Sequence, residues 1–403
     1  MERNLFIEQK YQTAIVYEKQ NPSVIVSKLS NSITAGDSTY DACMPMLGDA
    51  PLAAANGLLY EFGLLDDIDT DKSYWMKYVY DSVSIGGYAF YCPGDINLSA
   101  YNTVQTVFFN KVMFKNLNLE ATHGNIYSLV KDGKWTVETM AAMGKVAGYD
   151  KNEDGITADD TFGIVSAVMI WAPLFYSSGM KLVTKDDNGL PTLSGLTDNT
   201  NAVYDIIEDI IEVVSTDHTG TITARLNFKG PDKFKSEEAL FWVECMYGQY
   251  EIVDMKSDYG IVPAPVWNEG DTYIANIHPN FTSVMSVPIK ADPAVSAAIL
   301  EDMSYYSQQL VIPEYYEKII HLRNLRDDES YEMLDIIYGN LSVDLALSLG
   351  TGLTIDTDIR DLVGNASTDK IASTLSGKVS SYNSYLNTIV KAWCKEGAKQ
   401  YGY

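Results

Sequence analysis

Residues Tyr259–Tyr273 read Y-G-I-V-P-A-P-V-W-N-E-G-D-T-Y, and V-P-I follows at Val287–Ile289. Farther along the chain, Ile312–Glu317 reads I-P-E-Y-Y-E and Arg326–Asp335 reads R-D-D-E-S-Y-E-M-L-D. Working outward from this stretch, short apolar segments typical of strands alternate with longer segments of helical spacing. This alternation predicts an α/β fold.

Several segments have the composition of buried strands. Ala14–Tyr17 (A-I-V-Y) and Tyr40–Pro45 (Y-D-A-C-M-P) are short and mostly apolar, and both are predicted to be strands. Tyr101–Asn110 is rich in β-branched and aromatic residues, and it is predicted to be a buried strand. The first half, Ala100–Gln105, is predicted to cross from one lobe to another.

Other segments have the periodicity and end signals of helices. Val24–Ala35 has helical spacing and is followed by Gly36, which suits a left-handed helix cap. Thr197–Val214 places its valine and isoleucine residues on one face, which predicts an amphipathic helix. A later helix is predicted to begin at Asp292-Pro293, because Asp can cap a helix and Pro fits its first turn.

Composition and charge exclude several classes of function. The chain has 403 residues and a formal net charge of −25, with a sequence pI of about 4.4. Nucleic acid is not an expected partner, because phosphate binding needs a basic face. No apolar run approaches the roughly 20 residues of a membrane span. The four cysteines are widely spaced, so buried free thiols are expected, with disulfides as the alternative.

Catalytic motifs are missing from the sequence. It contains no H-E-x-x-H, no G-x-S-x-G, no G-x-G-x-x-G and no P-loop, and the four histidines have no metal-ligand spacing. Paired carboxylates such as Asp66-Asp67 could suggest a glycosidase, but chance pairs are expected among 54 acidic residues. We therefore expect no enzyme activity and no required cofactor.

One loop imitates an EF-hand-type calcium loop. Carboxylate and amide oxygens stand at its first, third and fifth positions, and Gly155 stands at the sixth, where a sharp turn is needed. The predicted structural calcium ligands are Asp150, Asn152, Asp154, the carbonyl of Ile156, and Asp160. Position 12 is Thr161, so the bidentate acid is missing unless Asp160 takes that place. The alternative is a surface turn rich in Asp and Asn.

Taken in order, these segments resemble extracellular solute-binding protein family 1, the carbohydrate-type substrate-binding lipoproteins of ABC importers in Gram-positive gut bacteria. The similarity extends from residue 2 to about residue 345, through motifs that are weak singly but follow the family order. Besides the opening stretch, the motifs are E-R-N at Glu2–Asn4, A-G-D-x-x-Y-D at Ala35–Asp41, F-F-N-K at Phe108–Lys111, G-K-W-T at Gly133–Thr136, F-G-I at Phe162–Ile164, and Phe234–Phe241.

The resemblance implies a two-lobed, type II-like periplasmic-binding-protein fold with hinge-linked lobes and C-terminal helices. The expected parts are lobe 1 at 1–105 and 282–330, lobe 2 at 108–276 and 331–403, and hinge crossings near 100–108 and 274–283. The C-terminal helices are expected to pack mainly against lobe 2. Family members usually carry one more strand before the first helix, and an export signal would also lie upstream.

The resemblance also implies a ligand site between the lobes. Met46, Leu47 and Asp49 are expected to contact ligand from lobe 1, and His278 and Asn280 from the second crossing. Trp171 and Trp242 are expected to stack on the ligand from lobe 2, because a flat ring covers the apolar face of a pyranose. Core packing is the alternative for both tryptophans.

The expected function is an extracellular receptor that captures an oligosaccharide by hinge closure and delivers it to a permease. The resemblance implies a monomer that meets the membrane only through an upstream lipid anchor. The alternatives are a receptor for another solute, such as a peptide, and a secreted glycan-active enzyme.

Overall fold

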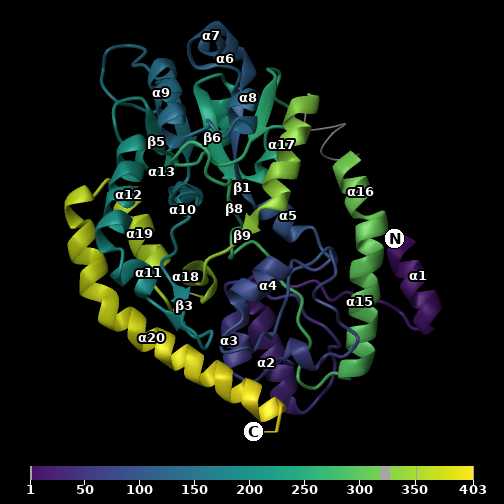
Figure 1. Cartoon of the computed structure of the whole chain (residues 1–403). Helices are drawn as coiled ribbons and strands as arrows, with labels where there is room; N and C mark the ends of the chain where they lie inside the picture. Colours follow the sequence, from purple (N-terminus) through teal and green to yellow (C-terminus); the bar gives the residue numbers. More distant parts are fainter. Residues whose placement is uncertain (1, 318–326, 351, 403) are drawn as a thin grey trace.

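The computed structural model describes residues 2–317, 327–350 and 352–402, which form two lobes in Figure 1. The upper lobe in this view contains a sheet with helices around it, and the lower lobe consists mainly of helices and loops. Residues 318–326 of the predicted lobe 1, which include Arg326 of the quoted motif, lie outside the described residues.

The sheet has five strands. They are β1 (Gln105–Asn110), β2 (Phe162–Ser166), β5 (Gly220–Ile222), β6 (Ala239–Cys245) and β7 (Tyr259–Val262). Their order is β5-β2-β6-β1-β7, with β2 parallel to β5 and β6, and β1 antiparallel to β6 and β7. Nearly every strand residue is buried, because helices cover both faces of the sheet. The strand predicted at Tyr101–Asn110 is confirmed as β1 from Gln105 onward, whereas the start of that segment belongs to the short helix α5 (Ser99–Thr103).

Two glycines let a helix approach this sheet closely. Gly144 lies in α9 (Val137–Ala147) and Gly163 lies in β2. A Cβ atom on Gly163 would lie 2.2 Å from the backbone oxygen of Gly144, so no larger residue fits there without displacing the helix. The F-G-I motif therefore has a packing role in addition to forming a strand.

Three predicted helices are confirmed with their end signals. Gly36 ends α2 (Ile25–Ala35) with a φ of +82°, the left-handed value that glycine adopts readily. The periodic segment forms α12 (Thr200–Val213). The side chain of Asp292 accepts hydrogen bonds from two backbone N–H groups in the first turn of α15 (Pro293–Leu310).

The other lobe has isolated β-bridges instead of a regular sheet. The return segment 283–288 bridges Cys43 and Met46 on one side and Leu59 and Cys92 on the other. The strand predicted at Tyr40–Pro45 is therefore reduced to a bridge at Cys43.

The strand predicted at Ala14–Tyr17 is wrong, because this segment forms no strand in the structure. Its composition favours a strand, but a strand needs a neighbour to pair with, and this segment instead lines a cavity of about 700 Å³ together with 41–44. Val16 is consequently 87% exposed.

Short paired segments join the two lobes. Val104 bridges Ile277, and the backbone N–H of His278 donates to the carbonyl of Thr103 at 3.0 Å. Nearby, β8 (Ala275–Asn276) runs parallel to β9 (Leu341–Ser342). These contacts lie within the predicted crossings or beside them, whereas the lobe boundaries themselves stay predictions.

The last helix, α20 (Ile371–Gln400), contacts both lobes. It packs against α12 in the sheet-containing lobe and against α3 (Ala50–Ala55) in the other, and Figure 1 shows it running along both. Near its end, the Trp393 ring meets Phe90 edge to face at 5.0 Å. The expectation that 331–403 pack mainly against lobe 2 therefore fails for this helix, because its 30 residues reach beyond that lobe.

The other elements follow in chain order. Before β1 are α1 (Glu2–Tyr11), η1 (Pro22–Val24), η2 (Phe62–Leu64), α4 (Lys77–Val83) and α5 (Ser99–Thr103). Between β1 and β7 are α6 (Lys111–Asn116), α7 (Leu119–His123), α8 (Ile126–Lys131), η3 (Val168–Ile170), α10 (Trp171–Tyr176), β3 (Thr184–Lys185), β4 (Pro191–Thr192), α11 (Ser194–Thr197), α13 (Thr223–Leu226), α14 (Gly230–Lys235) and η4 (Met246–Tyr250). After β8 are α16 (Ile312–Glu314), α17 (Asp328–Gly339), α18 (Leu345–Ser348), α19 (Ile355–Gly364) and η6 (Thr368–Lys370).

All four cysteines are free, as expected, but only Cys92 and Cys245 are buried, whereas Cys43 and Cys394 are half-buried. No helix of the described chain is both long enough and apolar enough to pass through a membrane.

Candidate functional site

Two loops that are predicted to contact the ligand lie against each other. The N–H of Leu47 donates to the carbonyl of Thr282 at 2.8 Å, and that of Gly48 donates to the carbonyl of Pro279 at 3.1 Å. A Cβ atom on Gly48 would lie 2.6 Å from Oδ1 of the exposed Asn280 side chain, which shows how closely the two loops approach. The structure thus brings the loop 46–49 together with the loop that holds His278 and Asn280.

The side chains of these loops differ in accessibility. Leu47 is buried and belongs to the core, so only its backbone could reach a ligand. Met46 and Asp49 are half-buried, and Asn280 is exposed. Burial raises the pKa of the Asp49 carboxyl.

His278 is held in one orientation and in its neutral form. Its side chain is 5% exposed and stacks on Phe281, with ring centroids 4.3 Å apart. Its Nδ1 accepts a hydrogen bond from the backbone N–H of Asn280 at 3.2 Å, which leaves the proton on Nε2. Burial, and then the positive charge of Arg360, lower the pKa of His278 to about 4. The imidazole is therefore uncharged at neutral pH.

Phe281, Tyr247 and Glu244 are neighbours of His278 that the sequence analysis missed. The ring of Phe281 is 49% exposed and meets Tyr247 edge to face at 6.0 Å. The hydroxyl of Tyr247 donates to Oε1 of Glu244 at 3.2 Å. Burial raises the pKa of Glu244, although bonds donated by Cys245 and Tyr247 oppose that shift. For Glu244 and Tyr247, the available signal was their position at the end of β6 and directly after it, where binding residues are common.

Trp171 is hydrogen-bonded to one member of an ion pair. Its Nε1 donates to Oδ1 of Asp356 at 3.2 Å, and Asp356 pairs with Arg360 at 3.1 Å. Burial raises the pKa of Asp356, and the Arg360 charge opposes this. The positive charge of Arg360 acts on His278 and so relates this group to the first one. We call the residues of both groups the crossing cluster: Trp171, Glu244, Tyr247, His278, Phe281, Asp356 and Arg360.

Both predicted stacking tryptophans are buried. Trp171 is 0% exposed and packs against Phe175 and Tyr176 in α10. Trp242 is 1% exposed, and its ring stacks on Phe108 of β1 at 5.2 Å. Burial favours the core-packing alternative for both rings, and stacking on a ligand stays a prediction.

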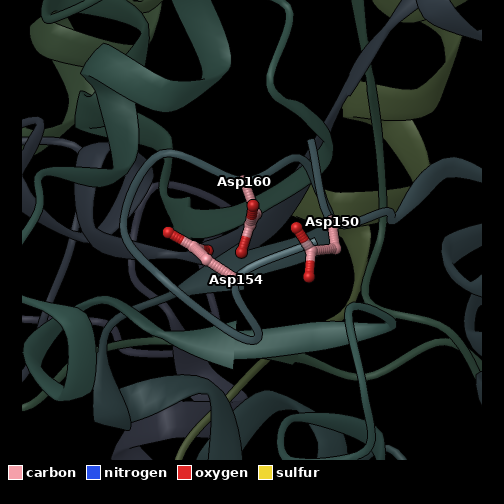
Figure 2. Close-up of side chains that lie close together, drawn as sticks. All are labelled: Asp150, Asp154 and Asp160. Carbon is pink, nitrogen blue, oxygen red and sulfur yellow. The ribbon is translucent and has the colours of Figure 1, made fainter. Parts of the chain in front are cut away.

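The predicted calcium loop gathers its carboxylates. Figure 2 shows the side chains of Asp150, Asp154 and Asp160 close together. One carboxylate oxygen of each lies within 4.8 Å of the others. These hard oxygen ligands are of the type that calcium prefers. Asn152 uses its amide N–H to bind Asp154 at 3.1 Å, and the Ile156 side chain is exposed.

Backbone donors already stabilise this loop. The carboxylate of Asp150 accepts bonds from the N–H groups of Asn152, Glu153 and Gly155, and that of Asp160 accepts bonds from those of Lys151 and Thr157. Burial alone would raise the pKa of both carboxyls, but these hydrogen bonds lower it. The geometry therefore suits both the Asp-rich turn and a cation site.

Comparison with known proteins identifies the fold. No protein-family profile and no curated protein sequence matches the chain. Among solved structures, a cyclo/maltodextrin-binding protein complexed with maltotetraose is 14% identical, with a TM-score of 0.61 over 98% of this chain and 92% of that one.

Two further structures extend the likeness. An ABC substrate-binding protein from Listeria monocytogenes in complex with cycloalternan is 13% identical, with a TM-score of 0.57 over 98% of this chain and 95% of that one. UgpB from Mycobacterium tuberculosis, in complex with glycerophosphocholine, is 12% identical, with a TM-score of 0.58 over 97% and 94%. The likeness spans the whole chain and confirms the predicted two-lobed periplasmic-binding-protein fold.

Proposed function

We propose that this chain is the substrate-binding receptor of an ABC importer and that its ligand is a carbohydrate, most simply an oligosaccharide. The observation that carries the proposal is the match of the whole two-lobed fold to sugar-binding receptors. The crossing cluster supports it, because an exposed aromatic ring beside hydroxyl and carboxylate groups suits a sugar. Solute-binding protein family 1 is the family we propose.

Ligand capture would proceed by hinge closure. The crossings pair through single bridges and short strands, so the two lobes can rotate with few bonds lost. A ligand that contacts the loop 46–49 together with Glu244 and Tyr247 touches both lobes. It would shift the population toward the closed form in proportion to its extra contacts there. The closed form would deliver the intact ligand to a permease.

The setting of such a receptor is part of the proposal. We propose that the protein acts outside the cell as a monomer, held at the membrane by a lipid anchor upstream of residue 1. Nucleic acid is not an expected partner of a chain with a net charge of −25. No cofactor is required for binding.

A thermal-shift screen tests the proposed function. The panel contains neutral oligosaccharides, glycerophosphocholine and short peptides, and a ligand that binds only the folded state raises the melting temperature. A shift with an oligosaccharide alone supports the carbohydrate receptor. A shift with glycerophosphocholine alone or with a peptide alone would mean that the ligand belongs to that class and is not a carbohydrate. Breakdown of the oligosaccharide would support the enzyme alternative.

We also propose that the loop 150–160 binds a structural calcium ion, on the evidence of its three converging carboxylates. Calcium would offset their mutual repulsion and link both ends of the loop. Adding millimolar calcium after chelation should raise the melting temperature, and Asp154→Asn should reduce this shift. The exposed loop acid Asp187 provides the control Asp187→Asn. Equal melting temperatures with and without calcium would leave only the surface turn.

A further inference from the structure

The aromatic ring of Phe281 is exposed on one side and is held in place by packing on the other. Its outer surface is half exposed, whereas the stacked His278 behind it is almost fully buried. The turn beneath is fixed by three bonds to the carbonyl of His278, from the N–H of Phe281, the N–H of Thr282 and the hydroxyl of Thr282. An aromatic surface held in this way loses little conformational entropy when a ligand covers it.

The groups around this ring come from the second crossing and from the lobe that holds the sheet. Phe281 lies in the second crossing, whereas Glu244 lies near the end of β6 and Tyr247 lies in η4, directly after it. The edge-to-face contact between Phe281 and Tyr247 therefore joins the second crossing to the segment that follows β6. A ring-shaped ligand entering here would replace that contact with one to each side.

The charges of the crossing cluster limit the ligand. Arg360 is already paired with Asp356, and His278 is neutral at physiological pH. Tyr247, whose ring meets that of Phe281, is hydrogen-bonded to the carboxyl group of Glu244. A carboxylate accepts strong hydrogen bonds from hydroxyl groups but repels another carboxylate or a phosphate.

We propose that Phe281, Tyr247 and Glu244 form a subsite for one uncharged sugar ring and that this subsite rejects acidic saccharides. The inference rests on the proposed carbohydrate function. The C–H face of the sugar lies on Phe281, as apolar faces cover aromatic rings. A hydroxyl group of the sugar donates to the carboxylate of Glu244, which keeps one oxygen free of Tyr247. Selection against acids arises because a bound anion would face this carboxylate in a protein that is itself strongly negative.

Calorimetric titration with two probes tests the subsite. Maltotetraose is the neutral probe, and tetragalacturonate is the acidic probe of matched length. Wild type should bind maltotetraose at least about tenfold more tightly than tetragalacturonate, since each tenfold step is about 1.4 kcal/mol. Phe281→Ala should weaken maltotetraose binding about tenfold, and Phe281→Tyr, which keeps the ring, should stay within about threefold. Glu244→Gln should reduce the difference in affinity between maltotetraose and tetragalacturonate.

Controls separate failure of the subsite from failure of the receptor. Tyr78→Ala removes an exposed aromatic of α4 and should leave both affinities unchanged. The unliganded melting temperature of Phe281→Ala should stay close to that of wild type, which excludes misfolding as the cause. If wild type binds maltotetraose and Phe281→Ala binds it equally well, the subsite is refuted and the receptor stands. If wild type binds tetragalacturonate more tightly than maltotetraose, the proposed selection against acidic saccharides is refuted. If wild type binds neither probe, the subsite is refuted for both sugar classes. The receptor function is refuted only if no oligosaccharide of the whole panel binds.

Discussion

Replacing Trp242 by alanine should destabilise the ligand-free protein strongly. The indole is 1% exposed, stacks on Phe108 at 5.2 Å and meets Phe234 at 6.0 Å. A Cβ on Gly230 would lie 2.6 Å from its Nε1, so backbone also closes around the ring. Removal of a buried tryptophan from such packing costs about 3–5 kcal/mol, through lost burial and the cavity left behind.

Urea unfolding of the ligand-free protein measures this effect. Trp242→Ala should lower the midpoint without a large change in slope, and Trp242→Phe, which refills part of the cavity, should recover about half of the loss. Phe281→Ala is the matched comparison, because its half-exposed ring should affect affinity more than stability. If Trp242→Ala unfolds like wild type but loses ligand affinity tenfold, the core interpretation is refuted and stacking on the ligand is restored.

Three further outcomes are expected. The pKa of His278 is lowered to about 4 from about 6.5 in the unfolded chain, so the unfolded state takes up this proton first as the pH falls. The free energy of unfolding should therefore decrease by up to about 3 kcal/mol between about pH 6.5 and pH 4, and His278→Gln should remove that part of a pH series of unfolding curves. Asp292→Ala should cost about 1 kcal/mol by uncapping α15, and Asp292→Ser should restore most of it in the same assay; equal midpoints would show that the cap contributes nothing. Trp393→Ala should speed amide exchange at the end of α20, where the ring packs on Phe90; unchanged exchange would mean that other contacts hold the helix to that lobe.

Local signals in the sequence predicted the elements that depend on local physics. The cap at Asp292, the left-handed Gly36 and the apolar face of α12 are each set by residues within a few positions of one another. Such features reach their structure regardless of the rest of the chain. The sheet strand β1 was also predictable, because β-branched and aromatic residues favour a buried strand wherever a partner exists.

Features that depend on distant partners were not predictable in this way. Ala14–Tyr17 has the composition of a strand, but nothing in that segment tells whether a neighbouring strand pairs with it. The length of α20 gave no sign that it would contact both lobes. In the candidate site, the sequence indicated His278 but not the ring that stacks on it, since Phe281 reaches it through a turn and meets Tyr247 from another segment.

Native mass spectrometry of the chain with a panel of neutral oligosaccharides tests the central proposal most directly. The receptor account predicts one added mass per chain, equal to an intact oligosaccharide, that saturates as the sugar concentration rises. Release and reanalysis of the bound sugar should return the same mass. Absence of any adduct across the panel, or the appearance of shorter saccharides, would contradict a receptor that captures its carbohydrate unchanged.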